Sequence, residues 1–241
     1  MNTRHFFHAS ALVTLGLFFP ACGGAESEIV SDDVLDEESV PVNMGLGSFA
    51  ILGNAAVTCT GGSVDGSVGT NLAPTAGSVT ACAPTVGAVH VGDVIAKAAF
   101  DDFLNRYDAL VPKAGQTCTV LTGTLAGITL PPGNYCFPAA ATLTGVLTLQ
   151  GPATGKWLFR VGTSGTGALT GTNFTVAMTG GAKACNVRWW VSQAATMTTS
   201  TFKGKILAGA AITLTGGSMK GNAWAKADAT NTGAAIAGCL P

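Results

Sequence analysis

The chain has 241 residues, enough for one domain with a buried core. Charged residues make up only 10% of it and hydrophobic residues 47%, with 33 Gly and 10 Pro, which favours short strands joined by tight turns over a disordered chain. The net charge of −1 hides an asymmetry, because from Gly45 onward eleven Lys/Arg residues stand against six Asp, a balance of +5. These bases are scattered along the sequence, which argues against a nucleic-acid-binding patch.

The first 21 residues are predicted to be a signal peptide. They begin with a basic segment, Met1-Asn-Thr-Arg4-His5, and continue into an apolar run at residues 11–19, which is too short to span a membrane. Phe19-Pro-Ala-Cys22 then resembles a bacterial lipobox, in which Cys22 is acylated and becomes the mature N-terminus. Gly23 after this cysteine resembles lipoproteins sorted to the outer membrane. We expect an exported outer-membrane lipoprotein or cell-surface protein, touching the membrane through its lipid anchor only; free secretion is the alternative.

Residues 22–44 are expected to be a flexible tether, because they combine many acids with few aromatic residues. The segment has no basic residue and carries seven acids: Glu26, Glu28, Asp32, Asp33, Asp36, Glu37 and Glu38. The folded domain should then occupy residues 45–241.

Six cysteines remain when Cys22 is set aside, and an even number in an exported chain indicates disulfides. Closure of short loops favours Cys59–Cys82 and Cys118–Cys136, which leaves Cys185–Cys239 to hold the C-terminus. Six buried free thiols are the alternative. A metal site is not expected, since there is no C-x-x-C and His90 is the one histidine beyond the signal peptide. No cofactor motif is present either.

A short threonine phrase recurs along the chain and predicts stacked strands. Its copies are Thr58-Cys-Thr60-Gly61, Thr142-Leu-Thr144-Gly145, Ala168-Leu-Thr170-Gly171, Thr196-Met-Thr198-Thr199 and Thr213-Leu-Thr215-Gly216. Residues 56–68 and 212–224 also share one longer pattern of apolar residues, threonines and glycines, which indicates an internal repeat. Strands this short cannot bury a face alone, but stacked coils can, so the sequence favours a mainly β fold, a three-sided β-solenoid.

Alternation of side chains assigns each coil three faces. On the first, Leu143, Leu169, Met197 and Leu214 should point inward, between the outward pairs Thr142/Thr144, Ala168/Thr170, Thr196/Thr198 and Thr213/Thr215. On the second, Phe174, Phe202 and Met219 should point inward, with Asn173/Thr175, Thr201/Lys203 and Ser218/Lys220 outward. The third face has apolar runs around Trp157, Trp190, Leu207 and Trp224, which implies cover on both sides.

One amphipathic helix is predicted at residues 91–111, and it is the natural cover for the third face. Its apolar stripe consists of Ile95, Ala99, Phe103, Tyr107 and Leu110, widened by Ala96, Phe100 and Leu104. Lys97, Asp101, Asn105 and Asp108 fall on the opposite side. Asp93 is the expected N-cap, Asp102 and Arg106 an i,i+4 ion pair, and Pro112 the end of the helix.

Catalysis is not expected from this sequence. Four of the six acids in the domain belong to the helix, leaving Asp65 and Asp228 near strands, so a carboxylate pair for glycoside chemistry is improbable. This argues against a polysaccharide-active solenoid. His90 is interpreted as structural. Trp189 and Trp190 are expected in the core or under the helix, with a sugar-stacking platform as the alternative.

The outward threonines of the first face suggest a surface that orders water. Because Thr is stiff at χ1, a stack of T-x-T strands would hold methyl and hydroxyl groups on a regular grid, which suits ice rather than a small molecule. The candidate ice-binding residues are Thr58, Thr60, Thr142, Thr144, Thr170, Thr196, Thr198, Thr213 and Thr215. A simple preference of Thr for exposed strands is the alternative explanation.

The domain resembles a large microbial ice-binding protein family of secreted, right-handed, discontinuous β-solenoids with one long flanking helix. The resemblance runs from about residue 45 to 236 and is carried by Leu46-Gly-Ser-Phe-Ala-Ile-Leu52, His90-Val-Gly-Asp93, Gly127-Ile-Thr-Leu-Pro-Pro-Gly-Asn-Tyr135, Leu143-Thr-Gly-Val-Leu-Thr-Leu149 and Ala184-Cys-Asn-Val-Arg-Trp189. It implies three-sided coils, a helix on one side, ice binding through another, and a coil order that differs from chain order.

Some members of that family carry a T-[AG]-x-[TN] phrase on the binding side. Thr170-Gly-Thr-Asn173 matches it, while Thr215-Gly-Gly-Ser218, Thr198-Thr-Ser-Thr201 and Thr144-Gly-Val-Leu147 match in part. The phrase spans the turn between the first two faces and does not choose between them. Lys203, Lys220 and Asp65 place charge on the second face, so we prefer the first. We therefore expect a monomeric, non-enzymatic ice-binding protein; the alternative is a surface-adhesion or envelope module, motivated by the anchor, the second-face lysines and Trp190.

Overall fold

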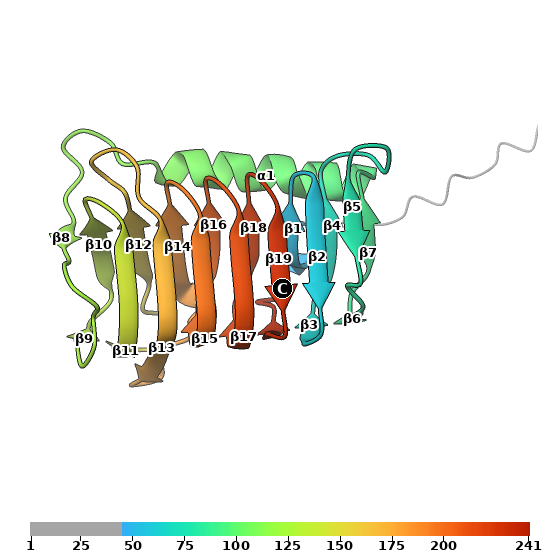
Figure 1. Ribbon diagram of the computed structural model, residues 1–241. Helices are drawn as coiled ribbons and strands as arrows, with labels where there is room; N and C mark the ends of the chain where they lie inside the picture. Colours follow the sequence, from blue (N-terminus) through green and yellow to red (C-terminus); the bar gives the residue numbers. More distant parts are fainter. Residues whose placement is uncertain (1–44) are drawn as a thin grey trace, which may run out of the picture. The chain divides into compact units, whose positions relative to one another are not determined.

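The computed structural model describes residues 45–241, so the predicted signal peptide, Cys22 and the predicted acidic tether lie outside the described residues. Two parallel sheets make up this part of the chain (Figure 1). The nine-stranded sheet contains β1 (Phe49–Gly53), β4 (Ser67–Thr70), β7 (Val89–Val91), β8 (Thr119–Val120), β10 (Gly133–Phe137), β12 (Trp157–Val161), β14 (Val187–Val191), β16 (Lys205–Ala208) and β18 (Ala223–Ala225). The second sheet contains β2 (Ala56–Thr60), β3 (Ser63–Asp65), β5 (Ser78–Thr80), β6 (Pro84–Val86), β9 (Thr129–Leu130), β11 (Ala141–Gln150), β13 (Leu169–Thr179), β15 (Ala195–Lys203), β17 (Ile212–Lys220), β19 (Ala229–Thr232) and β20 (Ala235–Ala237).

The strands wind into three-sided coils, which confirms the predicted β-solenoid with one long helix alongside. The nine-stranded sheet is the side next to the helix, and we call it the helix face. The second sheet bends and supplies two sides. The Thr face is the outward side of β5, β2, β19 and the first halves of β17, β15, β13 and β11; the Lys face is the outward side of β6, β3, β20, β9 and the second halves of the same four long strands.

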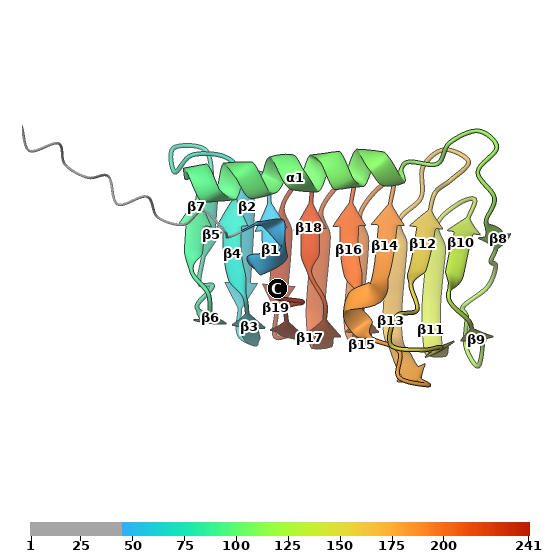
Figure 2. The same cartoon turned by 180° about the vertical axis from the view of Figure 1, so that it is seen from behind.

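The order of the coils along the stack differs from their order in the chain, as the family resemblance implied. The helix face runs β7-β4-β1-β18-β16-β14-β12-β10-β8. The chain starts third from one end, builds outward to β7, and then travels the length of the stack through the helix to β8 (Figure 2). It returns coil by coil until β18, β19 and β20 pair with β1, β2 and β3. First and last coils are therefore neighbours.

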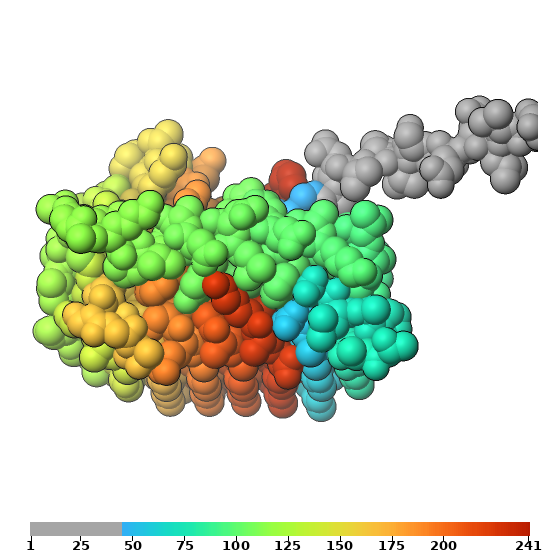
Figure 3. Space-filling view, turned by 90° about the horizontal axis from the view of Figure 1, so that it is seen from above, coloured from blue at the N-terminus to red at the C-terminus, as the bar shows by residue number. Residues whose placement is uncertain are grey.

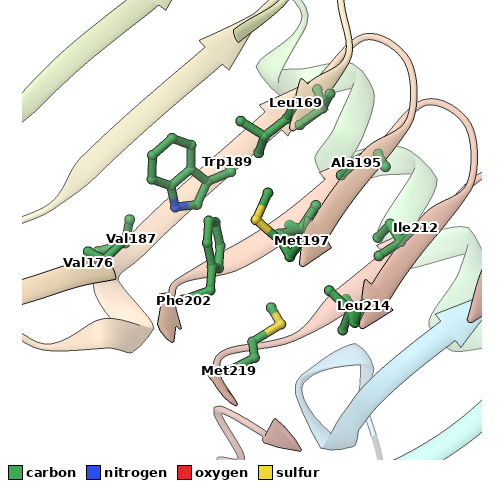
Figure 4. Packing of buried hydrophobic residues seen from close by; sticks show 14 of the residues in the cluster. Leu169, Val176, Val187, Trp189, Ala195, Met197, Phe202, Ile212, Leu214 and Met219 are labelled. Carbon is green, nitrogen blue, oxygen red and sulfur yellow. The ribbon is translucent and has the colours of Figure 1, made fainter. Parts of the chain in front are cut away.

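The core fills the space between the three sides with large apolar side chains in stacked rows. Tyr135, Phe159 and Trp189 are in register on β10, β12 and β14, with ring centroids 5.3 and 3.9 Å apart, and Trp189 continues to Phe202 at 5.2 Å. Figure 4 shows Trp189 and Phe202 beside Met197, Leu214 and Met219. Phe174, Phe202 and Met219 are at most 3% exposed, as predicted. Each such burial stabilises the fold by about 1.5–3 kcal/mol.

Helix α1 (Val94–Leu110) covers the helix face as predicted. Its residues Ala96, Ala99, Phe100, Phe103 and Tyr107 are buried in a second apolar cluster, whose sheet side consists of Leu46 of the 3-10 helix η1 (Leu46–Ser48) and of Phe49, Leu52, Trp190, Leu207 and Trp224. Lys97, Asp101, Asn105 and Asp108 are exposed. The predicted Asp102–Arg106 pair forms through two hydrogen bonds of 2.9 Å. None of the helices in the described range is both long and apolar enough to cross a bilayer.

Both ends of α1 are held by hydrogen bonds. The N-cap Asp93 accepts from the Ala96 N–H at 2.8 Å and lies 2.7 Å from His90 Nδ1. Burial alone would raise the pKa of Asp93, but the bonds to Ala96 and His90 hold it below its ordinary value. At the other end, Arg160 Nε donates to the Leu110 carbonyl at 2.8 Å, a favourable position for a cation at a helix C-terminus. Burial lowers the pKa of this guanidinium.

Tyr107 fixes the last turn of α1 to the sheet beneath it. Its hydroxyl donates to the Val191 carbonyl at 3.2 Å, and its own carbonyl accepts from Trp190 Nε1 at 3.1 Å. Burial, with the charge of Asp108 as a second cause, raises the pKa of Tyr107 to about 12. These two hydrogen bonds therefore fix the position of the helix along the stack of coils.

Three disulfides form, with the pairings that the sequence favoured. Cys59–Cys82 ties β2 to the segment after β5, Cys118–Cys136 ties the segment before β8 to β10, and Cys185–Cys239 ties the 3-10 helix η2 (Ala184–Asn186) to the segment after β20. Their Cα atoms lie 4.9, 5.9 and 5.5 Å apart, within the usual range. Such bonds typically contribute about 2–4 kcal/mol each, so they fasten the two exposed ends of the stack and its C-terminus.

Candidate functional site

Threonines on neighbouring strands of the Thr face stand directly beside one another in two files. The first file holds seven residues that pair in register: Thr80, Thr58, Thr230, Thr213, Thr196, Thr170 and Thr142. The second holds five: Thr60, Thr232, Thr215, Thr198 and Thr172. All twelve are exposed or partly exposed. The structure therefore brings the predicted residues together on one surface and adds more threonines to them.

The prediction placed β13 two residues out of register, and the structure corrects it. Thr170 pairs with Thr142 and Thr196, so it belongs to the first file, and the T-x-T of this strand is Thr170-Gly-Thr172 rather than Ala168-Leu-Thr170. Leu169 does point inward, but the residue level with Leu143 and Met197 is Gly171. A Cβ at Gly171 would lie 2.6 Å from Met197 Sδ, so the Met197 side chain occupies the space that a larger residue would need.

The corner between the Thr face and the Lys face explains why the phrase was misread. The residue after each T-x-T has a left-handed backbone, with φ of 68° at Gly145, 48° at Asn173, 50° at Thr199 and 61° at Gly216. Glycine adopts this conformation freely and Asn more readily than most residues. Matching Gly171 to the other glycines therefore chose the wrong partner, since Asn173 turns this corner.

Four threonines of the grid were missed: Thr80, Thr172, Thr230 and Thr232. The sequence pattern required an apolar residue between two threonines, which excluded Thr230-Asn-Thr232. Asn231 is nevertheless 1% exposed and points inward, where its side chain donates to the Ala234 carbonyl and accepts from the Ala234 N–H, both at 3.1 Å. T-x-T spacing followed by Gly or Asn is the signal that would have found this strand.

Thr144 is the one predicted residue that the ladder does not fully align. The register between β11 and β13 jumps between Leu143 and Gly145. Thr144 occupies the second-file position of its own phrase and is partly exposed. The second file is therefore in register from β13 to β2, but its alignment is not maintained at β11.

The two files of the Thr face contain no charged residue, and the strands that carry them pair in regular register. From β13 through β15, β17, β19 and β2 to β5, the pairing keeps its register throughout the T-x-T segments. Seen from above in Figure 3, evenly spaced columns in the colours of these strands form the lower edge of the solenoid. Six strand spacings of about 4.8 Å make the first file about 29 Å long, and the files lie about 6.6 Å apart.

Small side chains continue the surface beside the first file. Each residue of this row directly precedes the first inward residue of its strand. The row consists of Ala140, Ala168, Ala194, Ala211, Asp228 and Ala56. Asp228 is the exception to this row, and its Oδ1 accepts from the Ala56 N–H at 2.9 Å. The Lys face differs, because Lys203 and Lys220 are in register on β15 and β17 and Asp65 lies in the same row.

Other candidate groups are accounted for by the fold. His90 is buried between Phe49 and the Asp93 carboxylate. Trp189 is 0% and Trp190 4% exposed, so neither can stack on a sugar, and the adhesion alternative loses the role it gave to Trp190. Within residues 45–241, no three His, Cys, Asp or Glu side chains gather closely enough to hold a metal ion.

Comparison with known proteins identifies the family of this domain. The model of the ice-binding-like family matches residues 51–236, which include every strand of the Thr face and the whole of α1. The chain belongs to the ice-binding-like family. Its corners, helix and threonine files are therefore features of one member of that family.

Among relatives of this ice-binding-like protein, an ice-binding protein from Nostoc sp. (strain HG1) is 37% identical over 175 residues, which is 68% of this chain and 61% of the relative. An ice-binding protein from Flavobacterium frigoris (strain PS1) is 28% identical over 187 residues, covering 71% and 66%. This chain thus spans slightly under two thirds of each. The crystal structure of an ice-binding protein from the Antarctic ascomycete Antarctomyces psychrotrophicus superimposes with a TM-score of 0.71 at 29% identity, covering 81% of this chain and 96% of that one.

Proposed function

We propose that this ice-binding-like protein binds ice through its Thr face, as a monomer and without catalysis. The observation that carries the proposal is the file of seven threonines in unbroken register across seven strands. Family membership and the names of the relatives support it. One copy of the chain presents the whole grid, so the proposal needs no partner subunit.

The chemistry of threonine explains how such a surface would hold ordered water. A strand fixes χ1 of a β-branched residue, so each methyl and hydroxyl keeps one orientation. The hydroxyl can donate and accept hydrogen bonds to water, while the methyl restricts the waters around it. A repeat of about 4.8 by 6.6 Å then presents the same groups again and again to a crystalline surface. No strongly hydrated charge within the two files has to lose its own water.

The Lys face is the less suitable candidate, although it belongs to the same strands. Lys203 and Lys220 carry ammonium groups that keep their hydration shells. Lys220 Nζ also donates to the Gly238 carbonyl at 2.8 Å, which holds that charge against the surface. On the same face, the pairing between β3 and β6 changes register between Val64 and Asp65. Charge and irregular spacing both oppose a continuous water lattice.

A bulky substitution at the centre of the grid tests the proposal. Thr213→Tyr places a ring above the first file, and we expect thermal hysteresis and ice-affinity partitioning to be abolished while the melting temperature is kept. Thr201→Tyr makes the same chemical change on the Lys face and should leave both activities intact. Undiminished hysteresis in the Thr213 variant, or equal loss in the Thr201 variant, contradicts the assignment of the Thr face.

We also propose that the chain is exported and anchored to the outer membrane through a lipid on Cys22. The sequence Phe19-Pro-Ala-Cys22 and the three disulfides, which suit an oxidising compartment, support this. Mass spectrometry of the mature N-terminal peptide should find an acylated Cys22 in the membrane fraction. Cys22→Ser should release the protein from that fraction. An unmodified N-terminus in the soluble exported fraction would establish free secretion instead.

A further inference from the structure

A positively charged hollow lies beside α1 on the helix face. The strands of this face lie on the side of the solenoid away from the strands of the Thr face (Figures 1 and 2). It has a volume of about 120 Å³. Its cations are Arg106 of α1, Arg188 of β14 and Lys205 of β16, and its apolar floor includes Leu207 and Trp224. In Figure 2 the strands β16 and β18 are seen below the helix, between η1 and η2. There is room for one group the size of a phosphate or a carboxylate.

The three cations have too little negative charge to balance them. Arg188 and Lys205 are in register on neighbouring parallel strands, an arrangement that like charges disfavour. Asp102 is the carboxylate that contacts this group, and both of its oxygens already accept from Arg106. Burial, followed by the positive charges of Arg188 and Arg106, lowers the pKa of Lys205. An oxyanion in the hollow would relieve this repulsion.

A second hollow of about 220 Å³ shares Arg188 with the first. It adds Lys156 and the amide side chains of Asn134 and Asn186, whose oxygens can accept from hydroxyl groups. The Asn186 amide nitrogen already donates to the Ala153 carbonyl at 2.9 Å, which orients this side chain. Leu158, Arg188 and Lys205 form one row across β12, β14 and β16, so the two hollows extend over two strand spacings, roughly 10 Å. This pattern of cations and amides suits a chain with repeated anionic groups and hydroxyls between them.

Two other classes of polyanion fit less well. A lipid surface is usually contacted through exposed apolar side chains, but none of the exposed large apolar residues in the described range lines either hollow. A single-stranded nucleic acid stacks its bases on accessible aromatic rings, whereas Trp157, Trp189, Trp190 and Trp224 are at most 4% exposed. Acidic sugar polymers require neither feature.

We infer that the two hollows joined at Arg188 bind an acidic polysaccharide, with its carboxylate or phosphate groups on Arg188, Lys205 and Lys156. Arg188 supplies a planar fork for one oxyanion, and the lysines supply point charges on either side. Because this surface and the Thr face lie on opposite sides, the protein can hold a sugar polymer and ice at once. The inference stands independently of ice binding.

The test uses the full chain and alginate, a polymer of carboxylated sugars, with uncharged dextran as the negative control. The variant carries Arg188→Gln and Lys205→Gln. The matched control carries Lys203→Gln and Lys220→Gln, which removes the same two charges from another in-register pair on adjacent strands. We expect the wild-type chain to bind alginate and not dextran, with an affinity that falls as salt rises. The Arg188/Lys205 variant should lose about tenfold or more, and the control less than about twofold.

Each other outcome overturns the inference. Equal loss of alginate binding in both double variants would show that binding depends on net charge alone. Unchanged binding in the Arg188/Lys205 variant would show that these residues do not form the binding site. Vesicles of phosphatidylglycerol and phosphatidylcholine that bind better than alginate, and lose binding in the same variant, would assign the hollow to a lipid headgroup. Inorganic phosphate that competes at the same concentration as alginate sugar units would reduce the site to a single free anion. Ice-affinity partitioning of both double variants separates this result from the proposed function.

Discussion

The Thr face and the Lys face share the four long strands β11, β13, β15 and β17, yet only the Thr face presents a uniform surface. On β15 and β17 the Thr face pairs Thr196 with Thr213 and Thr198 with Thr215, whereas the Lys face pairs Thr201 with Ser218 and Lys203 with Lys220. Backbone spacing is shared, so it does not distinguish them. What differs is that one side repeats a single uncharged side chain, and the other mixes hydroxyls with ammonium groups.

The comparison also shows that a regular solenoid does not by itself make a regular surface. The inward residue between the two files differs from strand to strand: it is Cys59, Asn231, Leu214, Met197 and Gly171 on successive strands. The core accommodates these different residues in different ways: Cys59 forms a disulfide, Asn231 makes hydrogen bonds, and Gly171 leaves space for Met197. The outward threonines stay in register above them, which indicates that the outer surface is the constrained feature.

A charge placed on the Thr face should reduce ice binding more than any other change discussed below. Thr196→Lys puts an ammonium group in the middle of the first file, and we expect most of the thermal hysteresis to be lost because the charge keeps its own hydration shell. Thr201→Lys adds the same charge to the Lys face, next to Lys203, and should change hysteresis little. Freezing-point measurements on both variants at equal concentration decide the matter; similar losses would mean that the two faces do not differ in function.

Most of the fold could be predicted from the sequence because its signals are local. The T-x-T alternation gave the inward and outward sides, and the spacing of Ile95, Ala99, Phe103 and Tyr107 gave the helix. Asp93 as N-cap and the three disulfide pairings also depend on nearby residues or on elimination. Each of these needs knowledge of only one strand, one helix or one loop.

Register between coils could not be predicted in the same way, because it depends on contacts between distant segments. Gly171 can be recognised as the residue level with Leu143 and Met197 only once it is known that the Met197 side chain fills the space beside it. Asn231 counts as an inward residue only when Ala234 satisfies its amide. The cationic hollow required β14, β16 and α1 to be brought together, although their residues are far apart in the chain.

Filling the space at Gly171 should damage the Thr face from below. A Cβ there would meet Met197 Sδ at 2.6 Å, so Gly171→Ala should lower the free energy of unfolding by about 1–3 kcal/mol through overpacking. It should also disturb the alignment of Thr170 and Thr172 and reduce hysteresis. The Met197→Ala background supplies the control, since the cost of Gly171→Ala should fall below about 1 kcal/mol once the clash is removed. Thermal unfolding of the four proteins measures this, and an unchanged cost in the Met197→Ala background would show that the clash is not the cause.

The corner between the two faces should respond to substitution with smaller effects of opposite sign. Thr199 is exposed and has a φ of 50°, a conformation that costs a β-branched residue about 1–2 kcal/mol, so Thr199→Gly should stabilise the fold by about 0.5–1 kcal/mol after the entropy cost of glycine. Gly216 turns the next corner at 61° with open space around it, so Gly216→Thr should destabilise by about the same amount through backbone strain alone. Melting temperatures that move in these opposite directions, with hysteresis little changed in both variants, would show that the corner sets the angle between the faces without contacting ice. A loss of hysteresis at constant stability in either variant would instead place the corner residues within the ice-binding surface.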